Sequence, residues 1–430
     1  MDVVSTRNPA LHATFRHALT ANLTPDGGLW IPARLLPFAN LDALLELPLA
    51  DRCAEILKRV IGDEFSHADL DALAHDAFNF PLPLTQIDEQ TYALELFHGP
   101  TLAFKDFGAR LLARLLRLHD ADTTSATPRM ILTATSGDTG AAVAHAFWRQ
   151  PGARVVVLYP RGRVSEMQER QFAALGDNVL ALAVDGSFDD CQALAKACFN
   201  DAALSQELRL TSANSINLAR ILAQVLYYFE ISAALRGRGV RQAPVVSVPS
   251  GNFGNLCAGL YAQKRGLPIG PFIAATNANR TVPDFLHGGE YLTKPSVATL
   301  SNAMDVGAPS NWERIAALFG QDRAAMQAAM RSDSATDAET RAEIARLWQL
   351  GWLADPHAAV ASAVLQKLRK PGELGVFLAT AHPAKFPDAV VEVTGRAVEL
   401  PPELAALVHL ELQAEPLAND VVALKRRLRA

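Results

Sequence analysis

A lysine between two aromatic residues is the first feature of this sequence that suggests chemistry. Lys105 stands between Phe104 and Phe107, ahead of a leucine-rich segment with helical spacing. Aromatic neighbours that exclude water lower the pKa of an amine, and a neutral amine is a nucleophile that forms Schiff bases. The alternative is a surface lysine paired with Asp106, its aliphatic stem lying on the protein. Single lysines more often have that second role, so the neighbouring motifs must decide between the two interpretations of Lys105.

Two loops with glycine and hydroxyl residues are candidate anion sites. Segment 250–255 follows the apolar run Val245–Val248 and opens a helical segment, and segment 135–140 stands in the same way between a strand and a helix. Converging backbone N–H groups at a helix N-terminus attract phosphate or carboxylate. Segment 250–255 suits a phosphate, although it matches neither GxGxxG nor the Walker motif. Each loop is also typical of a plain turn, and Asp138 alone suits an N-cap.

A third loop combines amide, hydroxyl and guanidinium groups. Segment 214–220 leads into a helical stretch, and Arg220 lies about one helical turn inside it. A guanidinium can bind a phosphate through two parallel hydrogen bonds. Taken alone, the segment favours the structural alternative, in which Asn214 or Ser215 caps the helix and Arg220 is exposed.

A fourth loop, segment 380–385, follows the apolar run Gly375–Ala379. Thr380 is a candidate neutral hydrogen-bond partner, and Lys385 is a candidate contact for an anion. Considered in isolation, both residues are more typical of an ordinary surface.

Together, a desolvated lysine and two anion sites fit one type of cofactor. Pyridoxal 5′-phosphate requires a lysine for a Schiff base, a cradle for its phosphate and a partner for its pyridine nitrogen. In open parallel sheets, ligands bind beyond the carboxyl ends of the strands. Most of these segments follow strands or open helices, so we expect a pyridoxal phosphate site with Lys105 beside them.

The elements that must position these residues are those of an α/β protein. From about residue 92, apolar runs of about five residues alternate with helical segments, which is typical of βαβ units. Continuous apolar strands indicate a largely parallel sheet covered on both faces. Residues 1 to about 90 are predicted to be mostly helical. The expected strands are Met130–Ala134, Arg154–Tyr159, Val179–Val184, Val245–Val248, Phe272–Ala275 and Gly375–Ala379.

Composition excludes several classes of function. The 430 residues include 40 basic and 45 acidic side chains, so the net charge of −5 offers no basic surface for nucleic acid or an anionic membrane. The four cysteines have neither metal-ligand spacing nor the pattern of a disulfide framework, so we expect no metal site. No apolar run is long enough to span a membrane and no signal peptide is evident. A cytoplasmic protein of two or three domains is the simplest interpretation.

The motifs resemble those of the threonine synthase family, in its long bacterial and fungal form. The resemblance runs nearly end to end and includes several long ordered strings, which makes it highly specific. It rests on Ser5-Thr6-Arg7, Asp26–Leu29, Leu96–Gly108, Thr133–Ala142, Tyr159–Gly162, Ser212–Arg220, Ser247–Asn255, Leu300–Val306, Asp355–Val360 and Ala379–Phe386.

The resemblance implies a fold, a reaction and a set of site residues. The fold is pyridoxal-phosphate fold type II, with two open α/β domains, and the reaction converts O-phospho-L-homoserine and water to L-threonine and phosphate. Lys105 matches the Schiff-base lysine, and Thr380 matches the residue near the pyridine nitrogen. The cofactor-phosphate loop is matched by Gly251, Asn252, Phe253, Gly254 and Asn255. The substrate carboxylate loop is matched by Thr135, Ser136, Gly137, Asp138 and Thr139, and the substrate-phosphate region by Asn214, Ser215, Asn217 and Arg220.

The expected domains are residues 1–90 (the N-terminal region), 91–220 (a smaller α/β domain) and 221–430 (a larger α/β domain with a helical tail).

Two positions depart from related patterns. Asp138 stands where many relatives of this fold carry Asn, although long-form synthases often share the Asp. Arg280 stands where the long form usually has an acidic residue, and we assign it no role.

Three other functions are compatible with parts of the pattern. A phospho-amino-acid lyase on the same fold would eliminate phosphate and release a 2-oxo acid, and its motifs would be the same. A non-catalytic phosphometabolite-binding protein would not need Lys105. A nicotinamide oxidoreductase would need GxGxxG after its first strand, which is missing. The sequence does not show the oligomeric state.

Overall fold

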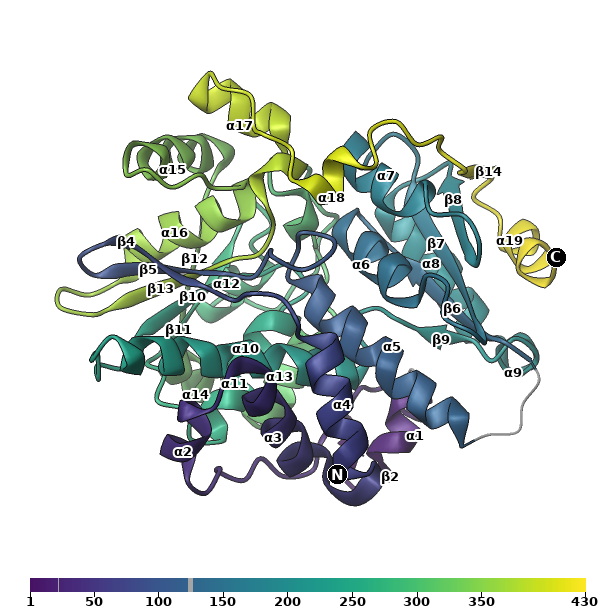
Figure 1. Cartoon of the computed structure of the whole chain (residues 1–430), viewed down its shortest axis with the longest axis horizontal. Helices are drawn as coiled ribbons and strands as arrows, with labels where there is room; N and C mark the ends of the chain where they lie inside the picture. The colour runs from purple at the N-terminus through teal and green to yellow at the C-terminus, as the bar shows by residue number, and fades with distance from the viewer. Residues whose placement is uncertain (22, 123–126) are drawn as a thin grey trace.

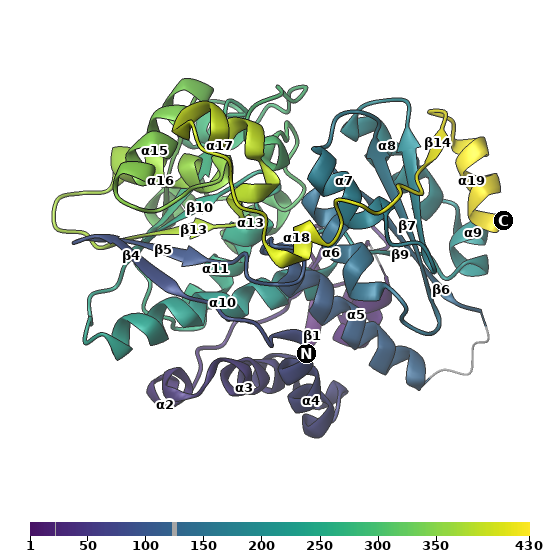
Figure 2. The ribbon, with the colours of Figure 1, turned by 45° about the horizontal axis from the view of Figure 1, so that its top comes forward.

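A computed structural model describes residues 1–21, 23–122 and 127–430. Two sheets lie side by side, each flanked by helices, and an N-terminal region packs against one side of both (Figures 1 and 2). The site described below lies where the two sheets face each other.

The larger sheet has six strands, and all neighbours are parallel except the edge pair β4–β5. The four inner strands are buried along their whole length, as expected for a sheet covered on both faces. In spatial order the strands are β12 (Met330–Ser334), β11 (Phe272–Thr276), β10 (Val245–Pro249), β13 (Gly375–Ala379), β5 (Thr91–Glu95) and β4 (Leu84–Asp88).

The smaller sheet has five strands and is parallel throughout. In spatial order its strands are β14 (Glu415–Leu417), β8 (Val179–Val184), β7 (Ala153–Pro160), β6 (Arg129–Ala134) and β9 (Thr211–Ser212). The helices of this half are α5 (Lys105–Ala121), α6 (Asp138–Phe147), α7 (Glu166–Ala173), α8 (Phe188–Phe199), α9 (Ala202–Glu207) and α19 (Val421–Arg429).

Helices α10 and α16 form much of the cover of the larger sheet. Helix α10 (Leu218–Gly237) is long and apolar enough to cross a membrane, but 83% of its most apolar stretch is buried inside the protein, which makes it a core helix. Helix α16 (Pro356–Leu368) packs on β10, β11 and β13. The others are α11 (Gly254–Lys264), α12 (Thr281–Leu286), α13 (Trp312–Leu318), α14 (Arg323–Ala329), α15 (Asp337–Gln349), α17 (Pro387–Thr394) and α18 (Pro402–Ala405).

The N-terminal region is more mixed than the mostly helical prediction. It contains an antiparallel sheet in the order β2-β1-β3, which the sequence analysis missed because each strand is only three or four residues long. Helices α2 (Leu41–Glu46), α3 (Leu49–Ile61) and α4 (His67–Ala77) lie below α5 and α10 in Figure 2. The elements of the region are β1 (Asp2–Ser5), β2 (His12–Thr14), β3 (Trp30–Pro32), α1 (Phe15–Thr20), α2 (Leu41–Glu46), α3 (Leu49–Ile61) and α4 (His67–Ala77).

The α/β class with largely parallel sheets is confirmed, but the two sheets do not follow a division at residues 91 and 221. Strand β5 pairs with β13 in the larger sheet, although it precedes Lys105. Strand β14 pairs with β8 in the smaller sheet, although it comes near the C-terminus. Both pairings join segments far apart in the sequence, so no local pattern reveals them.

Candidate active site

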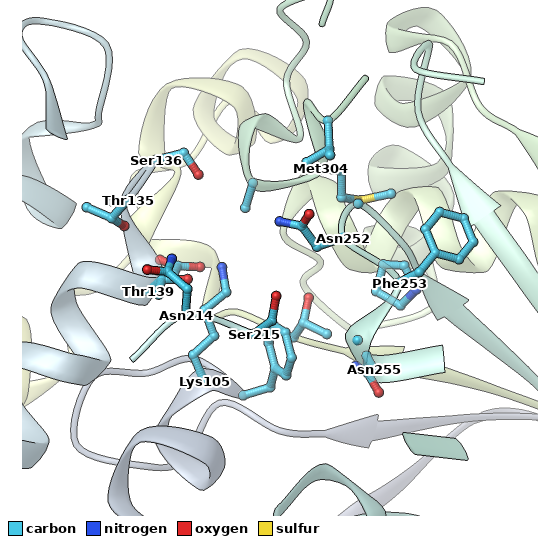
Figure 3. Close-up of a pocket in the computed structure, with 18 of the residues that line it drawn as sticks. Lys105, Thr135, Ser136, Thr139, Asn214, Ser215, Asn252, Phe253, Asn255 and Met304 are labelled. Carbon is cyan, nitrogen blue, oxygen red and sulfur yellow. The ribbon is translucent and has the colours of Figure 1, made fainter. Parts of the chain in front are cut away.

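One cavity lies where the carboxyl ends of parallel strands from both sheets meet. Thr135 follows β6, Asn214 follows β9, Gly251 follows β10 and Thr380 follows β13, and all four line the cavity. Lys105, at the start of α5, lines it as well, and its side chain points into the space between Asn214 and Asn252 (Figure 3). The strand ends therefore bring together four loops that are far apart in the sequence.

Lys105 has the environment expected of a reactive amine. Its Nζ lies 5.6 Å from the centre of the Phe104 ring. The pKa of Lys105 is lowered to about 8, mainly by burial; the charge of Asp138 opposes this shift, and the positive charges of Arg220 and Lys385 contribute to it. The proposed alternative, pairing with Asp106, is wrong. Asp106 instead accepts hydrogen bonds from the Thr101 backbone N–H (2.8 Å) and hydroxyl (2.7 Å).

The loop after β10 has the backbone expected of an anion cradle. Gly251 passes so close to Met304 that a β-carbon would lie 2.9 Å from its Cα, and Phe253 has a left-handed φ of 60°. The Oδ1 atom of Asn252 accepts hydrogen bonds from the backbone and hydroxyl of Ser310 (3.2 and 3.0 Å). The loop is therefore held from outside, and it leads into the N-terminus of α11, where backbone N–H groups and the helix dipole favour an anion.

Asn255 leaves one donor unused at this loop. Its Oδ1 accepts hydrogen bonds from the hydroxyls of Tyr227 and Tyr228, each at 2.7 Å. Its Nδ2 is buried and has no hydrogen-bond partner among the described residues. Buried donors are rarely left unpaired, so this amide indicates a ligand that accepts a hydrogen bond.

The loop after β6 is held by Thr135. Its hydroxyl accepts hydrogen bonds from the N–H groups of Gly137 (2.9 Å) and Gly140 (2.8 Å). Gly137 has a φ of 138°, shapes the turn and does not itself line the cavity, whereas Ser136, Asp138 and Thr139 do. The residue that caps α6 is Gly137, so the N-cap alternative for Asp138 is wrong.

The segment 214–220 divides between the cavity and the fold. Asn214, Ser215 and Arg220 line the cavity, but Asn217 does not. Asn217 caps α10 by accepting a hydrogen bond from the Ala219 N–H (3.0 Å), and its Nδ2 donates to Leu19 O (2.9 Å). Both ends of its amide are thus used by the fold, and its predicted contact with substrate gains no support from this placement.

Arg220 is buried rather than exposed. It is 2% exposed, it donates to the Ala213 carbonyl, and its Nε is unpartnered within the part of the chain that the structure describes. Burial lowers the pKa of Arg220 to about 10, which leaves it cationic at neutral pH. A buried cation with a free donor in a cavity is suited to a phosphate.

The segment after β13 differs from the surface alternative. Thr380 is 5% exposed and Lys385 is fully buried. Lys385 pairs with Asp138 and does not line the cavity. Arg280, to which the sequence assigned no role, does not line the cavity either. It pairs with Asp284 and Asp333 (both 3.2 Å).

His357 lines the cavity and was missed by the sequence analysis. Its Nδ1 lies 2.6 Å from Asp355 Oδ2, and its Nε2 accepts a hydrogen bond from the Ala303 N–H (3.2 Å). The Asp-Pro-His string at 355–357 was a visible signal, because Asp before Pro is a typical helix start. Its role in the cavity depends on segment 301–306, which only the fold brings near.

Comparison with known proteins agrees with this geometry. A family model described as pyridoxal-phosphate dependent enzyme matches residues 80–376, and models described as the N terminus and the C-terminal part of threonine synthase match residues 2–78 and 358–427. Threonine synthase of Haemophilus influenzae is 47% identical over 431 residues, covering 100% of this chain and 99% of the relative. This chain belongs to the threonine synthase family.

Solved structures of threonine synthases share its whole fold. The crystal structure of threonine synthase from Escherichia coli gives a TM-score of 0.94 at 46% identity and covers 100% of this chain and 99% of that chain. A pyridoxal-phosphate-bound threonine synthase from Brucella melitensis gives a TM-score of 0.92 at 36% identity, with coverage of 100% and 99%. Among the described residues, no group of His, Cys, Asp and Glu is arranged to hold a metal ion.

Proposed function

We propose that this threonine synthase family member is a carbon–oxygen lyase that converts O-phospho-L-homoserine and water to L-threonine and phosphate, the last step of threonine biosynthesis. The observation that supports this best is the set of residues that share a cavity with Lys105. An amine with a lowered pKa shares one cavity with Arg220 and Asn255, and each of these residues has a buried donor (Nε and Nδ2) that lacks a partner within the described chain. A phosphorylated cofactor and a phosphorylated substrate together need such donors.

The residues of the cavity fit pyridoxal 5′-phosphate. Lys105 would attach it covalently, the backbone of 251–255 and the Asn255 amide would hold its phosphate, and Thr380 would face its pyridine nitrogen. When bound, the cofactor supplies an electron sink that stabilises a carbanion at the substrate α-carbon. The hydroxyl of Thr380 is neutral, so it would not fully protonate the ring nitrogen as a carboxylate partner does.

Lys105 would act as the general base toward the α-carbon of the substrate. A general base works best when its pKa lies near the operating pH. A pKa of about 8 leaves a useful fraction of Lys105 neutral near pH 7.5, whereas an ordinary lysine would be almost fully protonated. Lys105 would then move protons between the α-carbon and the β-carbon of the substrate.

The two ends of the substrate would occupy different loops. The hydroxyls of Ser136 and Thr139 and the N-terminus of α6 would receive its carboxylate. Asn214, Ser215 and Arg220 would hold its phosphate, which leaves from the γ-carbon before water adds at the β-carbon. Arg220 is suited to this role because its guanidinium is already desolvated and fixed.

The test is a product assay with O-phospho-L-homoserine on the purified, cofactor-saturated protein. We expect threonine and phosphate in equal amounts, with visible absorbance of the bound cofactor that Lys105→Ala abolishes. The exposed Lys264, on α11, provides the control Lys264→Ala, which should keep both. Phosphate together with 2-oxobutyrate in place of threonine would assign the chain to the phospho-amino-acid lyases. A cofactor-saturated protein without visible absorbance would contradict the proposal.

We also propose that the protein works in the cytoplasm. Its four cysteines are all free and buried, as suits a reducing compartment. Fractionation of cells that express the tagged protein should recover it with the soluble cytoplasmic enzymes.

A further inference from the structure

A buried ion pair stands beside the carboxylate loop. Asp138, the first residue of α6, is 3% exposed, and Lys385 is 0% exposed. The Nζ of Lys385 lies 2.7 Å from Oδ1 of Asp138. Asp138 lines the cavity and Lys385 does not, so the lysine approaches the aspartate from the side away from the cavity.

Lys385 is held in this position by both halves of the molecule. It ends the 3-10 turn η3 (Pro383–Lys385), which follows β13 of the larger sheet. Its Nζ also donates to Thr101 O (2.8 Å), and its carbonyl accepts a hydrogen bond from the Ser165 hydroxyl (3.2 Å), at the start of α7. Gln168 donates to Oδ1 of Asp138 (2.9 Å) from the same helix. The pair is therefore a built feature that joins the end of β13 to the smaller half.

The position of Asp138 raises an electrostatic problem. Burial alone would raise the pKa of the Asp138 carboxyl, but the charges of Lys385 and Lys105 hold it well below its usual range, so Asp138 is an anion. It stands in the loop that we propose receives the substrate carboxylate. Two buried carboxylates near each other repel strongly unless a cation lies between or behind them.

We propose that Lys385 is a positioning residue that neutralises Asp138, so that the loop 135–139 can accept the substrate carboxylate and Asp138 does not hold Lys105 in its protonated form. The inference rests on the proposed function for its substrate part. Its second part concerns only the chain itself and can be measured without cofactor or substrate.

The charges that face Lys105 determine what should happen when Lys385 is removed. They come from Asp138 at the start of α6, Arg220 on α10 and Lys385 in η3. Asp138 favours the protonated amine, and the two cations disfavour it. Loss of the Lys385 charge leaves the negative charge of Asp138 without its adjacent cation, so Lys105 should titrate at a higher pH.

The experiment compares Lys385→Met, Asp138→Asn and the double variant. The first readout is the pH midpoint of Lys105 acetylation in the cofactor-free full chain, quantified by peptide mass spectrometry. We expect Lys385→Met to raise the midpoint by about one pH unit or more, Asp138→Asn to lower it, and the double variant to return it to within about half a unit of the parent. The second readout is KM for O-phospho-L-homoserine, which should rise about tenfold or more in Lys385→Met and recover in the double variant.

Lys367→Met is the matched control. Lys367 also binds one carboxylate, Glu339 (2.6 Å), and one carbonyl, Ser334 O (2.9 Å), but it does not line the cavity. It should change neither readout. If Lys385→Met does not fold, as judged by circular dichroism, the comparison of Asp138→Asn with the double variant carries the test, because these two proteins differ only at Lys385; the double variant should have the higher midpoint, and equal midpoints would overturn the role of Lys385.

The outcomes separate the two proposals. An unchanged midpoint in both single variants, or a double variant as impaired as Lys385→Met, would overturn the role of Lys385. Parent enzyme that makes no threonine, with midpoints that still shift in opposite directions, would overturn the proposed function and leave the effect of the pair on Lys105 intact.

Discussion

Gly108 lies directly against the guanidinium of Arg220. A β-carbon at residue 108 would overlap the Nε atom of Arg220, which is its unpartnered donor within the described chain, and would press on Cδ. Gly108 belongs to α5, the helix that begins at Lys105, and Arg220 belongs to α10. The close contact between these helices thus sets the distance between Lys105, the proposed attachment lysine, and Arg220, the proposed phosphate-binding arginine.

Gly108→Ala should therefore displace Arg220 without disturbing Lys105 directly. A misplacement of about 1 Å in a binding group can reduce rate about 100-fold, and we expect kcat/KM to fall by that order. Steady-state kinetics with O-phospho-L-homoserine measures this. Gly237→Ala is the control, because a β-carbon there meets no atom within 4 Å. Equal kinetics in the two variants would refute the coupling.

Asn255→Asp should weaken cofactor binding with little effect on the fold. The substitution keeps an oxygen to accept the hydroxyls of Tyr227 and Tyr228, but it removes the unpartnered Nδ2 donor and adds a negative charge. A lost hydrogen bond to a charged group corresponds to about 10-fold or more in affinity. Fluorescence titration of the cofactor-free chain measures the dissociation constant. The exposed Gln349 supplies the control Gln349→Ala, and an unchanged constant in Asn255→Asp would contradict the assignment.

Arg314 should be essential for the stability of the site. It is fully buried and donates to Trp30 O (3.1 Å), Ser215 O (2.9 Å) and Ile216 O (2.6 Å), so it joins the N-terminal sheet to the segment that we propose holds the substrate phosphate. Arg314→Met leaves these carbonyls unsatisfied and should lower the free energy of unfolding by about 3 kcal/mol or more.

Urea unfolding followed by circular dichroism measures the effect of Arg314→Met. The control is Arg7→Ala. Arg7 pairs with Glu313, the residue adjacent to Arg314, but it is half-exposed, and surface ion pairs contribute little to the free energy of unfolding. A larger loss in Arg7→Ala than in Arg314→Met would reverse the expected ranking.

His145 should make the protein less stable in mild acid. Burial lowers the pKa of His145, on α6, to about 4, from an ordinary value of 6.5, and its Nε2 has no partner in the described structure. Between these values the unfolded chain binds more protons than the folded chain, so stability falls as the pH decreases. From pH 7 to pH 5 the contribution of His145 is about 2 kcal/mol.

The measurement is the free energy of unfolding in urea at several pH values. His145→Gln should reduce the loss between pH 7 and pH 5, whereas the exposed His67→Gln should leave it unchanged. An identical pH dependence in His145→Gln and the parent would show that His145 is not held neutral.

The local chemistry of the site could be read from the sequence because each of its parts is a short segment that follows a strand. Lys105 with its aromatic neighbour, and the loops at 135–139 and 251–255, line one cavity as the motifs predicted. Asn217 was predicted to contact the substrate because it belongs to the string Asn-Ser-Ile-Asn, and that contact stays a prediction. Capping uses both ends of the Asn217 amide, and nothing local distinguishes it from Asn214.

The sequence by itself determined the α/β class, the lysine and the composition of the anion loops, since strand periodicity, glycine placement and helix starts are local properties. Only the tertiary structure decided that β5 and β14 cross between the expected domains, that Arg314 braces the site and that Lys385 opposes Asp138. These depend on hydrogen bonds and ion pairs between segments that are 98 or more residues apart in the sequence. Their strength comes from burial, which a residue acquires only when the chain packs.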